Sequence, residues 1–361
     1  MNWSPQQDDA LMAVERWRKA GGSQVFRLFG YAGAGKTTLA RHIAENAGGD
    51  VAFAAFTGKA AHVMRQKGCV GATTIHSLIY RPSSGDEEGE PSFTIRYDAP
   101  AADADLIIVD ECSMVDEELG RDLLSFNKPV LVLGDPAQLP PVKGGGYFTE
   151  GEPDFMLTEI HRQAADNPII RLSMAIREGG EFDEQSEECR VISRKDITTE
   201  EIMEADQILV GANRTRKRYN DRLRELHGHT DSSPEAGEKL VCLRNNKKKG
   251  LLNGGIWTVD RRMSPRGGRV RFSVRPEEGG RPVNVSVPRQ FFTEGPETVP
   301  WPQRKGADEF DYRYALTVHK AQGSQWDHVV LFDESYMFRE HGARWLYTGV
   351  TRAAERLTLV R

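Results

Sequence analysis

The sequence has few cysteines, and no two of them stand at the close spacing of a metal-binding pair. Cys69, Cys112, Cys189 and Cys242 stand far apart, so we expect reduced thiols and neither a disulfide framework nor a structural zinc site. No run of about 18 apolar residues occurs, which argues against a membrane-spanning helix. The first residues also lack the basic region followed by an apolar one that is typical of a signal peptide. The net charge of −5 gives no general attraction to nucleic acid, so any such partner must be held by local basic patches. We expect a cytoplasmic protein with no membrane partner.

The chain is long enough and apolar enough to form more than one hydrophobic core. With 361 residues, of which 39% are hydrophobic, it exceeds the usual size of a single core. Buried-strand patterns alternate with helical ones in its first part, as in α/β proteins. We therefore expect an α/β protein with two main lobes and small insertions.

The most specific motif is the glycine-rich Gly30–Thr37, which follows an apolar run and precedes a helix-prone segment. Its glycines let several N–H groups converge on a triphosphate at the start of the following helix. Lys36 would reach the β- and γ-phosphates, and the Thr37 hydroxyl would hold Mg²⁺. A dinucleotide fingerprint fits less well because Thr38 stands where its third glycine would be; a turn without ligand is the other alternative. The expected ATP contacts are Gly33, Ala34, Gly35, Lys36, Thr37 and Thr38.

Two glutamines stand at the start of the helix that is predicted from Pro5 onward with Ser4 as its N-cap. A glutamine amide carries both a donor and an acceptor, so it can read the edge of adenine. We assign this contact to Gln7 rather than Gln6. Glutamines at helix starts are otherwise simply solvated.

A second strand-to-helix loop is predicted where the buried run Val51–Phe56 ends in Thr57-Gly58-Lys59. In an open parallel sheet it would lie beside the first loop, at the edge where ligands bind. Thr57 and Lys59 could hold a second phosphate chain. The alternative is an ordinary capped helix start.

Residues 80–97 interrupt the α/β alternation. Their turn-rich, acidic tip lies between two short apolar stretches, a pattern typical of a protruding hairpin. A disordered surface loop is the alternative. If the hairpin forms, Phe93 is the aromatic residue that we expect to stack on a base, because it lies nearest the tip.

The continuous apolar run Leu106–Val109 predicts a buried parallel strand that delivers Asp110 and Glu111 to the sheet edge. Asp110 would contact Mg²⁺ through water, and Glu111 would orient or deprotonate the water that attacks the γ-phosphate. Another buried strand leads to Gln138, whose amide is placed to sense the γ-phosphate.

The second half of the chain has its own strand ends and basic stretches. Asn213–Arg218 follows a predicted strand and offers a contact to a phosphate backbone. From Lys239 to Arg275 the chain carries eleven Lys or Arg residues against one acidic residue, on short β-like runs that predict a small barrel. A merely solvated basic face is the alternative.

Taken in order, these motifs resemble those of superfamily 1 helicases. The resemblance spans the chain and is closest to the RecD-like and Dda-like branch, superfamily 1B. The segments that carry it are Gly30–Thr37, Thr57–Ala61, Thr74–His76, Asp110–Ser113, Gly134–Pro141, Leu157–Gln163, Leu251–Gly255, Ala315–Gln325 and Trp345–Ala353.

The resemblance implies two RecA-like P-loop NTPase lobes, with a small β-hairpin insertion in the first and an SH3-like β insertion in the second. The expected ranges are 1–79 and 98–160 for the ATP-binding lobe, 80–97 for the hairpin, 161–240 and 311–361 for the second lobe, and 241–310 for its insertion.

The resemblance also implies roles for individual residues. The arginines that reach the nucleotide from the other lobe map onto Arg162 and Arg352, and the adenine glutamine maps onto Gln7. Together with Lys36, Glu111 and Gln138, the two arginines make up the expected catalytic set. The residues expected to contact DNA are Thr57, Lys59, His76, Phe93, Asn213, Thr317 and His319.

The implied function is an ATP- and Mg²⁺-dependent 5′-to-3′ DNA helicase that acts on single strands and on junctions with duplex, in replication, recombination or repair. We expect a monomer, with single-stranded-DNA-binding or repair-complex proteins as possible partners. Two other classes stay open. A nucleotide kinase would turn over ATP regardless of single-stranded DNA, and a partner-dependent DNA-binding subunit would bind DNA without turnover.

Overall fold

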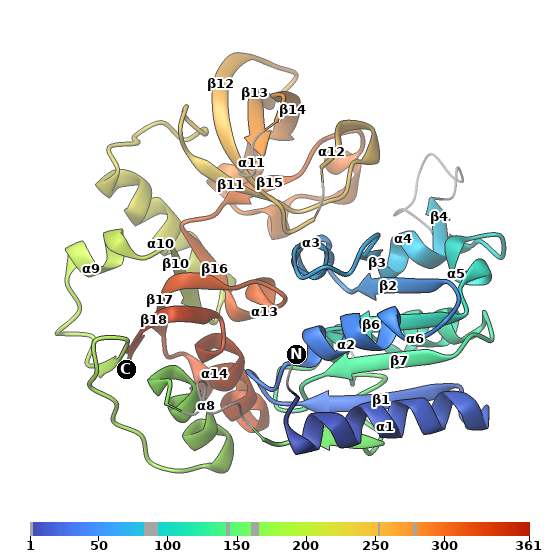
Figure 1. Cartoon of the computed structure of the whole chain (residues 1–361). Coiled ribbons are helices and arrows are strands. Elements are labelled where there is room, and N and C mark those ends of the chain that lie inside the picture. The colour runs from blue at the N-terminus through green and yellow to red at the C-terminus, as the bar shows by residue number, and fades with distance from the viewer. Residues whose placement is uncertain (1–2, 83–92, 142–144, 160–165, 252, 277–279) are drawn as a thin grey trace.

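The computed structural model describes residues 3–82, 93–141, 145–159, 166–251, 253–276 and 280–361. Two parallel β-sheets form two lobes, and a third, antiparallel sheet lies over the second lobe (Figure 1). A two-stranded ribbon completes the sheets that the structure describes. The α/β class and the two-lobed arrangement predicted from the sequence are confirmed.

The first lobe is a six-stranded parallel sheet in the order β3-β2-β6-β7-β1-β8. Strands β6 and β7 are buried over their whole length, because helices cover both faces of the sheet. The strand bounds are β1 Val25–Gly30, β2 Val51–Ala55, β3 Thr73–Thr74, β6 Leu106–Asp110, β7 Val130–Gly134 and β8 Phe155–Leu157.

The helices of this lobe divide between the two faces of the sheet. The apolar sides of α1, α2 and α3 pack into one core, and those of α4, α5 and α6 pack into the other. Since the strands are parallel, the loops after β1, β2, β6 and β7 open at the same edge. The helix bounds are α1 Pro5–Ala20, α2 Lys36–Glu45, α3 Gly58–Gln66, α4 Ile75–Ile79, α5 Pro100–Asp103, η1 Cys112–Met114 and α6 Glu117–Leu124.

A two-stranded antiparallel ribbon lies where the hairpin was predicted. It pairs β4 Tyr80–Pro82 with β5 Phe93–Ile95, in a register that sets Tyr80 opposite Ile95. Of the predicted tip, Arg81–Pro91, the first two residues belong to β4, and the rest lie outside the described residues.

The second lobe is a five-stranded parallel sheet in the order β16-β10-β17-β18-β9. Its core joins α8 and α14 to the sheet and extends to Leu139 of the first lobe. The bounds are α8 Pro168–Glu178, β9 Cys189–Ile192, α9 Thr199–Glu204, β10 Gln207–Val210, α10 Asn213–Leu226, β16 Ala315–Thr317, α13 Val318–Ala321, β17 Trp326–Phe332, η4 Ser335–His341, α14 Gly342–Val350 and β18 Ala353–Val360.

The third sheet is antiparallel, in the order β14-β13-β12-β11-β15. It extends from Lys239 to Tyr312, two residues beyond the range 241–310 at each end. Its elements are β11 Lys239–Cys242, η2 Lys247–Lys249, β12 Ile256–Arg266, β13 Arg269–Pro276, β14 Val283–Pro288, α11 Gln290–Thr293, η3 Pro296–Thr298, α12 Trp301–Arg304 and β15 Phe310–Tyr312.

Two buried arginines of α10 fix the third sheet to the second lobe. Arg216 forms an ion pair with Asp311 of β15. Arg224 binds the carboxylate of Glu238, next to β11, with Nε–Oε1 and Nη2–Oε2 distances of 2.7 and 2.9 Å. Breaking a buried pair costs more than the pair itself contributes, because one charge is left without a partner. Arg216 lies in the stretch predicted to contact a phosphate backbone, but its burial removes it from that surface.

The four cysteines are buried free thiols, as the sequence predicts. Burial raises the pKa of Cys69 to about 11 and those of Cys189 and Cys242 to about 12. Thiolates are the reactive form of cysteine, so these side chains act as core residues. No helix in the described part of the chain has the length and apolar character needed to cross a membrane.

Candidate nucleotide site and strand-binding surface

The glycine-rich loop joins β1 to α2 and is shaped by two left-handed glycines. Gly33 and Gly35 have φ values of 81° and 79°, a region that other residues adopt only under strain. The Ala34 N–H donates to the Tyr31 carbonyl at 3.2 Å and closes a turn. Gly35 is the N-cap of α2 and provides no side-chain cap, so the first N–H groups of the helix point toward the loop. This is the backbone geometry that a phosphate chain requires.

Lys36 lies across this loop. Its ammonium group donates to the carbonyls of Gly30 and Tyr31, at 2.6 and 3.0 Å. These contacts hold a positive charge against the start of the loop. A phosphate chain bound by the loop would exchange these neutral carbonyl acceptors for charged oxygens, which form stronger hydrogen bonds.

Thr37 and Asp110 meet at the edge of the first sheet. The Thr37 hydroxyl donates to Asp110 Oδ2 at 2.9 Å, and Asp110 Oδ1 accepts the N–H of Glu111 at 2.8 Å. Hydroxyl and carboxylate oxygens are the donors that Mg²⁺ selects, usually with phosphate oxygens and water as its other ligands. The described residues contain no group of three or more His, Cys, Asp or Glu able to hold a metal. This pair therefore fits a magnesium ion that arrives with a nucleotide.

Glu111 has a strained backbone next to the magnesium pair. Its φ and ψ of 53° and 44° lie in the left-handed region, which costs about 1–3 kcal/mol for a non-glycine residue. Burial raises the pKa of its carboxyl group, the positive charges of Arg352 and Lys36 oppose the rise, and the Asp110 carboxylate adds to it. A carboxylate with a raised pKa is a better proton acceptor, as a general base requires.

Two buried side-chain oxygens, in the segments that follow β6 and β7, have no hydrogen-bond partner among the described residues. They are Gln138 Oε1 and Ser113 Oγ, in side chains that are 6% and 2% exposed. A buried acceptor without a donor costs about 1–3 kcal/mol, so a water molecule or a ligand group is expected to supply one. The role of Gln138 as a sensor of the γ-phosphate stays a prediction.

Arg352 brings the second lobe into the same site. It lies between α14 and β18, is 6% exposed, and donates from Nε to the Thr348 carbonyl at 3.0 Å and from Nη1 to the Ser324 carbonyl at 3.2 Å. Its positive charge, on the second lobe, opposes the rise in the pKa of Glu111 on the first. The other predicted arginine, Arg162, lies outside the described residues.

The two glutamines of α1 have different environments. Gln6 binds the segment after β8, donating to Thr158 Oγ1 at 2.9 Å and accepting from the Thr158 N–H at 2.9 Å. Gln7 forms a capping box with Ser4 and donates to the Ala34 carbonyl at 3.2 Å. Gln7 is thus the glutamine in contact with the phosphate loop, and the helix start predicted at Ser4 and Pro5 is confirmed.

The loop after β2 meets the second lobe. Thr57 is the N-cap of α3 and accepts the Ala60 N–H at 3.1 Å. The ammonium group of Lys59 lies 4.6 Å from the centre of the Trp326 ring, at the start of β17. The capped helix start is thus confirmed, and contact of Thr57 and Lys59 with a phosphate chain stays a prediction.

His76 and the hairpin base lie next along this edge. The His76 ring is 6.2 Å from the Phe56 ring and 5.6 Å from the Tyr80 ring, and burial lowers its pKa. It is therefore neutral at neutral pH. Phe93 begins β5, opposite Pro82.

In the second lobe, the predicted strand contacts come from the ends of β10 and β16. Thr317 caps α13 by accepting the Lys320 N–H at 3.3 Å. The His319 ring lies 5.4 Å from that of Phe338, and burial lowers its pKa. Asn213 begins α10, where its Oδ1 accepts from Arg216 Nε at 3.3 Å.

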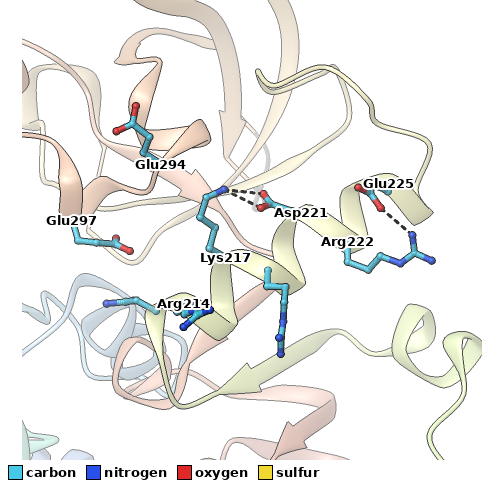
Figure 2. Close-up of a pocket in the computed structure, with 9 residues that line it drawn as sticks. Arg214, Lys217, Asp221, Arg222, Glu225, Glu294 and Glu297 are labelled. Atoms are coloured by element: carbon cyan, nitrogen blue, oxygen red, sulfur yellow. Dashed lines mark hydrogen bonds and ion pairs between the residues drawn. The ribbon is translucent and has the colours of Figure 1, made fainter.

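A hollow of about 540 Å³ borders Asn213, between α10 and the third sheet (Figure 2). Two ion pairs line it, since Lys217 binds Asp221 and Arg222 binds Glu225, both at 2.9 Å. The residues that line it are Asn213, Arg214, Lys217, Arg218, Asp221, Arg222, Glu225, Glu294 and Glu297.

Sequence reasoning assigned no role to Tyr347, which connects the lobes. Its hydroxyl accepts the Ala32 N–H at 3.1 Å and donates to Asp135 at 2.6 Å. A tyrosine inside an apolar helical stretch is typical of a core residue, so the local pattern gave no signal for this contact.

Family matches cover both halves of the chain. Residues 3–194 match the AAA domain family, and residues 312–360 match the UvrD-like helicase C-terminal domain. Over 93% of its length the chain is 30% identical to the ATP-dependent RecD2 DNA helicase of Deinococcus radiodurans, of which it covers 46%. The chain thus spans less than half the length of the curated relatives it matches.

Solved structures show the same fold. The structure of Bacteroides Pif1 bound to ssDNA superposes with a TM-score of 0.61 at 19% identity, over 99% of this chain and 92% of that one. The Pif1 helicase of Candida albicans superposes with a TM-score of 0.57 at 17% identity, over 100% and 94%. By the match over residues 3–194, more than half of its length, the chain belongs to the AAA domain family.

Proposed function

We propose that this chain is an ATP-driven motor that moves along single-stranded DNA and separates duplex ahead of it. The observation that supports the proposal is that the second lobe contacts the phosphate loop of the first: the Tyr347 hydroxyl accepts the Ala32 N–H, and the charge of Arg352 acts on Glu111. Hydrolysis in such a site depends on how the lobes sit relative to each other. A reaction cycle is thereby linked to lobe movement, which is what translocation requires.

Each residue of the site has a proposed role in hydrolysis. Lys36 and the loop N–H groups bind the phosphates, and Thr37 with Asp110 holds Mg²⁺, which would neutralise phosphate charge. Glu111 accepts a proton from the attacking water, while Gln138 contacts the γ-phosphate or that water. Arg352, with Arg162, stabilises the charge that develops on the transferred phosphoryl group; in related GTPases such an arginine contributes about 10³–10⁵ in rate. Gln7 reads adenine.

The proposed path of the DNA strand crosses the edge of each lobe at which its parallel β-strands end. Thr57, Lys59 and His76 supply contacts from the first lobe. Asn213, Thr317 and His319 supply them from the second, and Phe93 would stack on a base at the junction. The Deinococcus radiodurans relative is an ATP-dependent DNA helicase, and one similar solved structure contains Pif1 with ssDNA. These likenesses support DNA as the substrate, and the resemblance of the motifs to superfamily 1B supports 5′-to-3′ movement.

The wider setting is proposed from the same likeness. We infer a monomeric cytoplasmic protein that acts in replication, recombination or repair. Single-stranded-DNA-binding proteins or repair complexes are the partners that such a motor would meet.

An ATPase assay with and without single-stranded DNA tests the proposal. We expect turnover that rises strongly with DNA, because DNA binding favours the closed arrangement of the lobes. Turnover that is indifferent to DNA would point to a nucleotide kinase or a related enzyme. Tight DNA binding with no turnover would point to a DNA-binding subunit that needs a partner.

A further inference from the structure

The second lobe contacts the phosphate loop itself, through two side chains. Arg177, in the last turn of α8, has its guanidinium carbon 3.6 Å from the centre of the Tyr31 ring. Tyr347, in α14, accepts the N–H of the next loop residue, Ala32, at 3.1 Å. Helices α8 and α14 pack against each other in the core of the second lobe, and Ala32 packs against that core. The first half of the phosphate loop is therefore held from the opposite lobe.

Tyr347 also binds the segment that carries Gln138. Its hydroxyl donates to Asp135 Oδ2 at 2.6 Å, while Asp135 Oδ1 accepts the Ala137 N–H at 3.0 Å. Tyr347 is 1% exposed. Burial and the Asp135 carboxylate raise its pKa, so the hydroxyl keeps its proton. One hydroxyl thus joins the phosphate loop to the loop after β7.

The residue after Tyr347 makes a parallel contact. Thr348 Oγ1 accepts the Leu139 N–H at 2.9 Å, and Gln322 donates to the Leu139 carbonyl at 2.9 Å. Arg352 donates to the carbonyl of Thr348 at 3.0 Å. Tyr347, Thr348 and Arg352 are therefore parts of one connected unit at the end of α14.

We propose that Tyr347 is a positioning residue for hydrolysis, assisted by Arg177. By binding the phosphate loop and the segment that carries Gln138, it seats α14, and with it Arg352, against the first lobe. The inference rests on the proposed ATPase activity and deepens it, because it names the side chains that position Arg352. Tyr347 acts through Arg352 and is not itself proposed to touch the nucleotide.

This role predicts a separation between binding and turnover. The groups that bind nucleotide, from Gly33 to Thr37 with Asp110, all belong to the first lobe. Tyr347→Phe keeps the buried ring but removes one neutral and one charge-assisted hydrogen bond. We expect kcat for DNA-stimulated ATPase to fall about 10- to 100-fold. The dissociation constant for a fluorescent ADP analogue should change by no more than about twofold.

The matched control is Tyr314→Phe, which also removes a tyrosine hydroxyl from a carboxylate in the second lobe. Tyr314 donates to Glu238 at 3.0 Å, at the base of the third sheet. We expect its kcat to stay at the parent value. Arg177→Gln, which removes the cation above Tyr31, should lower kcat in the same direction as Tyr347→Phe. It provides a second test if the first variant folds poorly.

The double variant separates positioning from general damage. If Tyr347 acts through Arg352, adding Tyr347→Phe to Arg352→Ala should lower kcat by no more than about twofold beyond Arg352→Ala alone. Independent, multiplying losses would overturn the inference. So would a Tyr347→Phe variant with the parent kcat, or one whose nucleotide affinity falls tenfold while kcat holds. If the parent protein has no ATPase activity, the proposed function itself fails, which is a distinct result.

Discussion

Glu111→Gln is the most direct test of the proposed chemistry. Glutamine has the same shape as glutamate and can adopt the same backbone, but it cannot accept the proton of the attacking water. General-base catalysis contributes about 10²–10⁴ in rate, which corresponds to about 2.7–5.5 kcal/mol in activation free energy. We expect DNA-stimulated ATPase to fall by that factor, measured as phosphate release in a single turnover. Binding of ATP and of single-stranded DNA should persist.

The pH dependence of the ATPase rate of the parent enzyme tests the same general-base assignment. Burial raises the pKa of Glu111, against the opposing charge of Arg352, and only the ionised carboxylate can accept a proton. The rate should therefore fall as the pH is lowered through this raised pKa, at a higher pH than for an ordinary glutamate. The glutamine variant should lack this acid limb.

A glycine at the same position separates chemistry from folding. The φ of 53° at Glu111 is unstrained for glycine, and relief of that strain offsets the greater flexibility of the unfolded chain. Glu111→Gly should be at least as stable as the parent in a thermal unfolding scan, yet as inactive as Glu111→Gln. A glutamine variant that hydrolyses ATP at nearly the parent rate would refute the general-base assignment.

Four further predictions concern binding, polarity and stability. Lys36→Ala should abolish ATP turnover, because the phosphates lose their main cation; turnover near the parent rate would contradict the assignment of the loop. Phosphate contacts release counterions, so DNA affinity should drop steeply with salt, and Lys59→Ala should reduce the slope of log affinity against log salt by about one. An unchanged slope would remove Lys59 from the strand path. Replacing residues 83–92 by a two-residue turn should spare DNA-stimulated ATPase and stop strand separation on forks with a 5′ tail. Undiminished unwinding by the shortened variant would remove the hairpin from the mechanism. Unwinding by the parent protein from a 3′ tail alone would overturn the proposed polarity. Arg224→Ala leaves the Glu238 carboxylate buried without its cationic partner, so we expect a loss of about 3–5 kcal/mol in stability, measured by denaturant unfolding against the exposed control Arg222→Ala.

The sequence predicts the first lobe well because its signals are local. Continuous apolar runs mark β6 and β7, and glycine spacing followed by Lys36 and Thr37 marks the phosphate loop. The meeting of Thr37 with Asp110 follows from the rule that parallel strands end at one edge. These features depend on short stretches of chain, which a sequence displays directly.

What the sequence could not predict depends on contacts between distant segments. Arg216 and Arg224 lie in a strongly polar helix and look like solvent-exposed cations, yet each is buried against a carboxylate from the third sheet or beside it. Tyr347 resembles an ordinary core residue until the first lobe places Ala32 and Asp135 against its hydroxyl. In each case the deciding partner comes from another sheet or lobe, so no local pattern records it.

The two buried arginines of α10 also determine how the third sheet can move. They stand eight residues apart, which is about 12 Å along a helix axis, and each grips a carboxylate associated with the sheet. A single attachment point would act as a pivot, whereas two separated points resist rotation. The third sheet should therefore turn with the second lobe as a lever arm. A small angular change at the nucleotide site would then become a larger linear displacement at the far strand, β14.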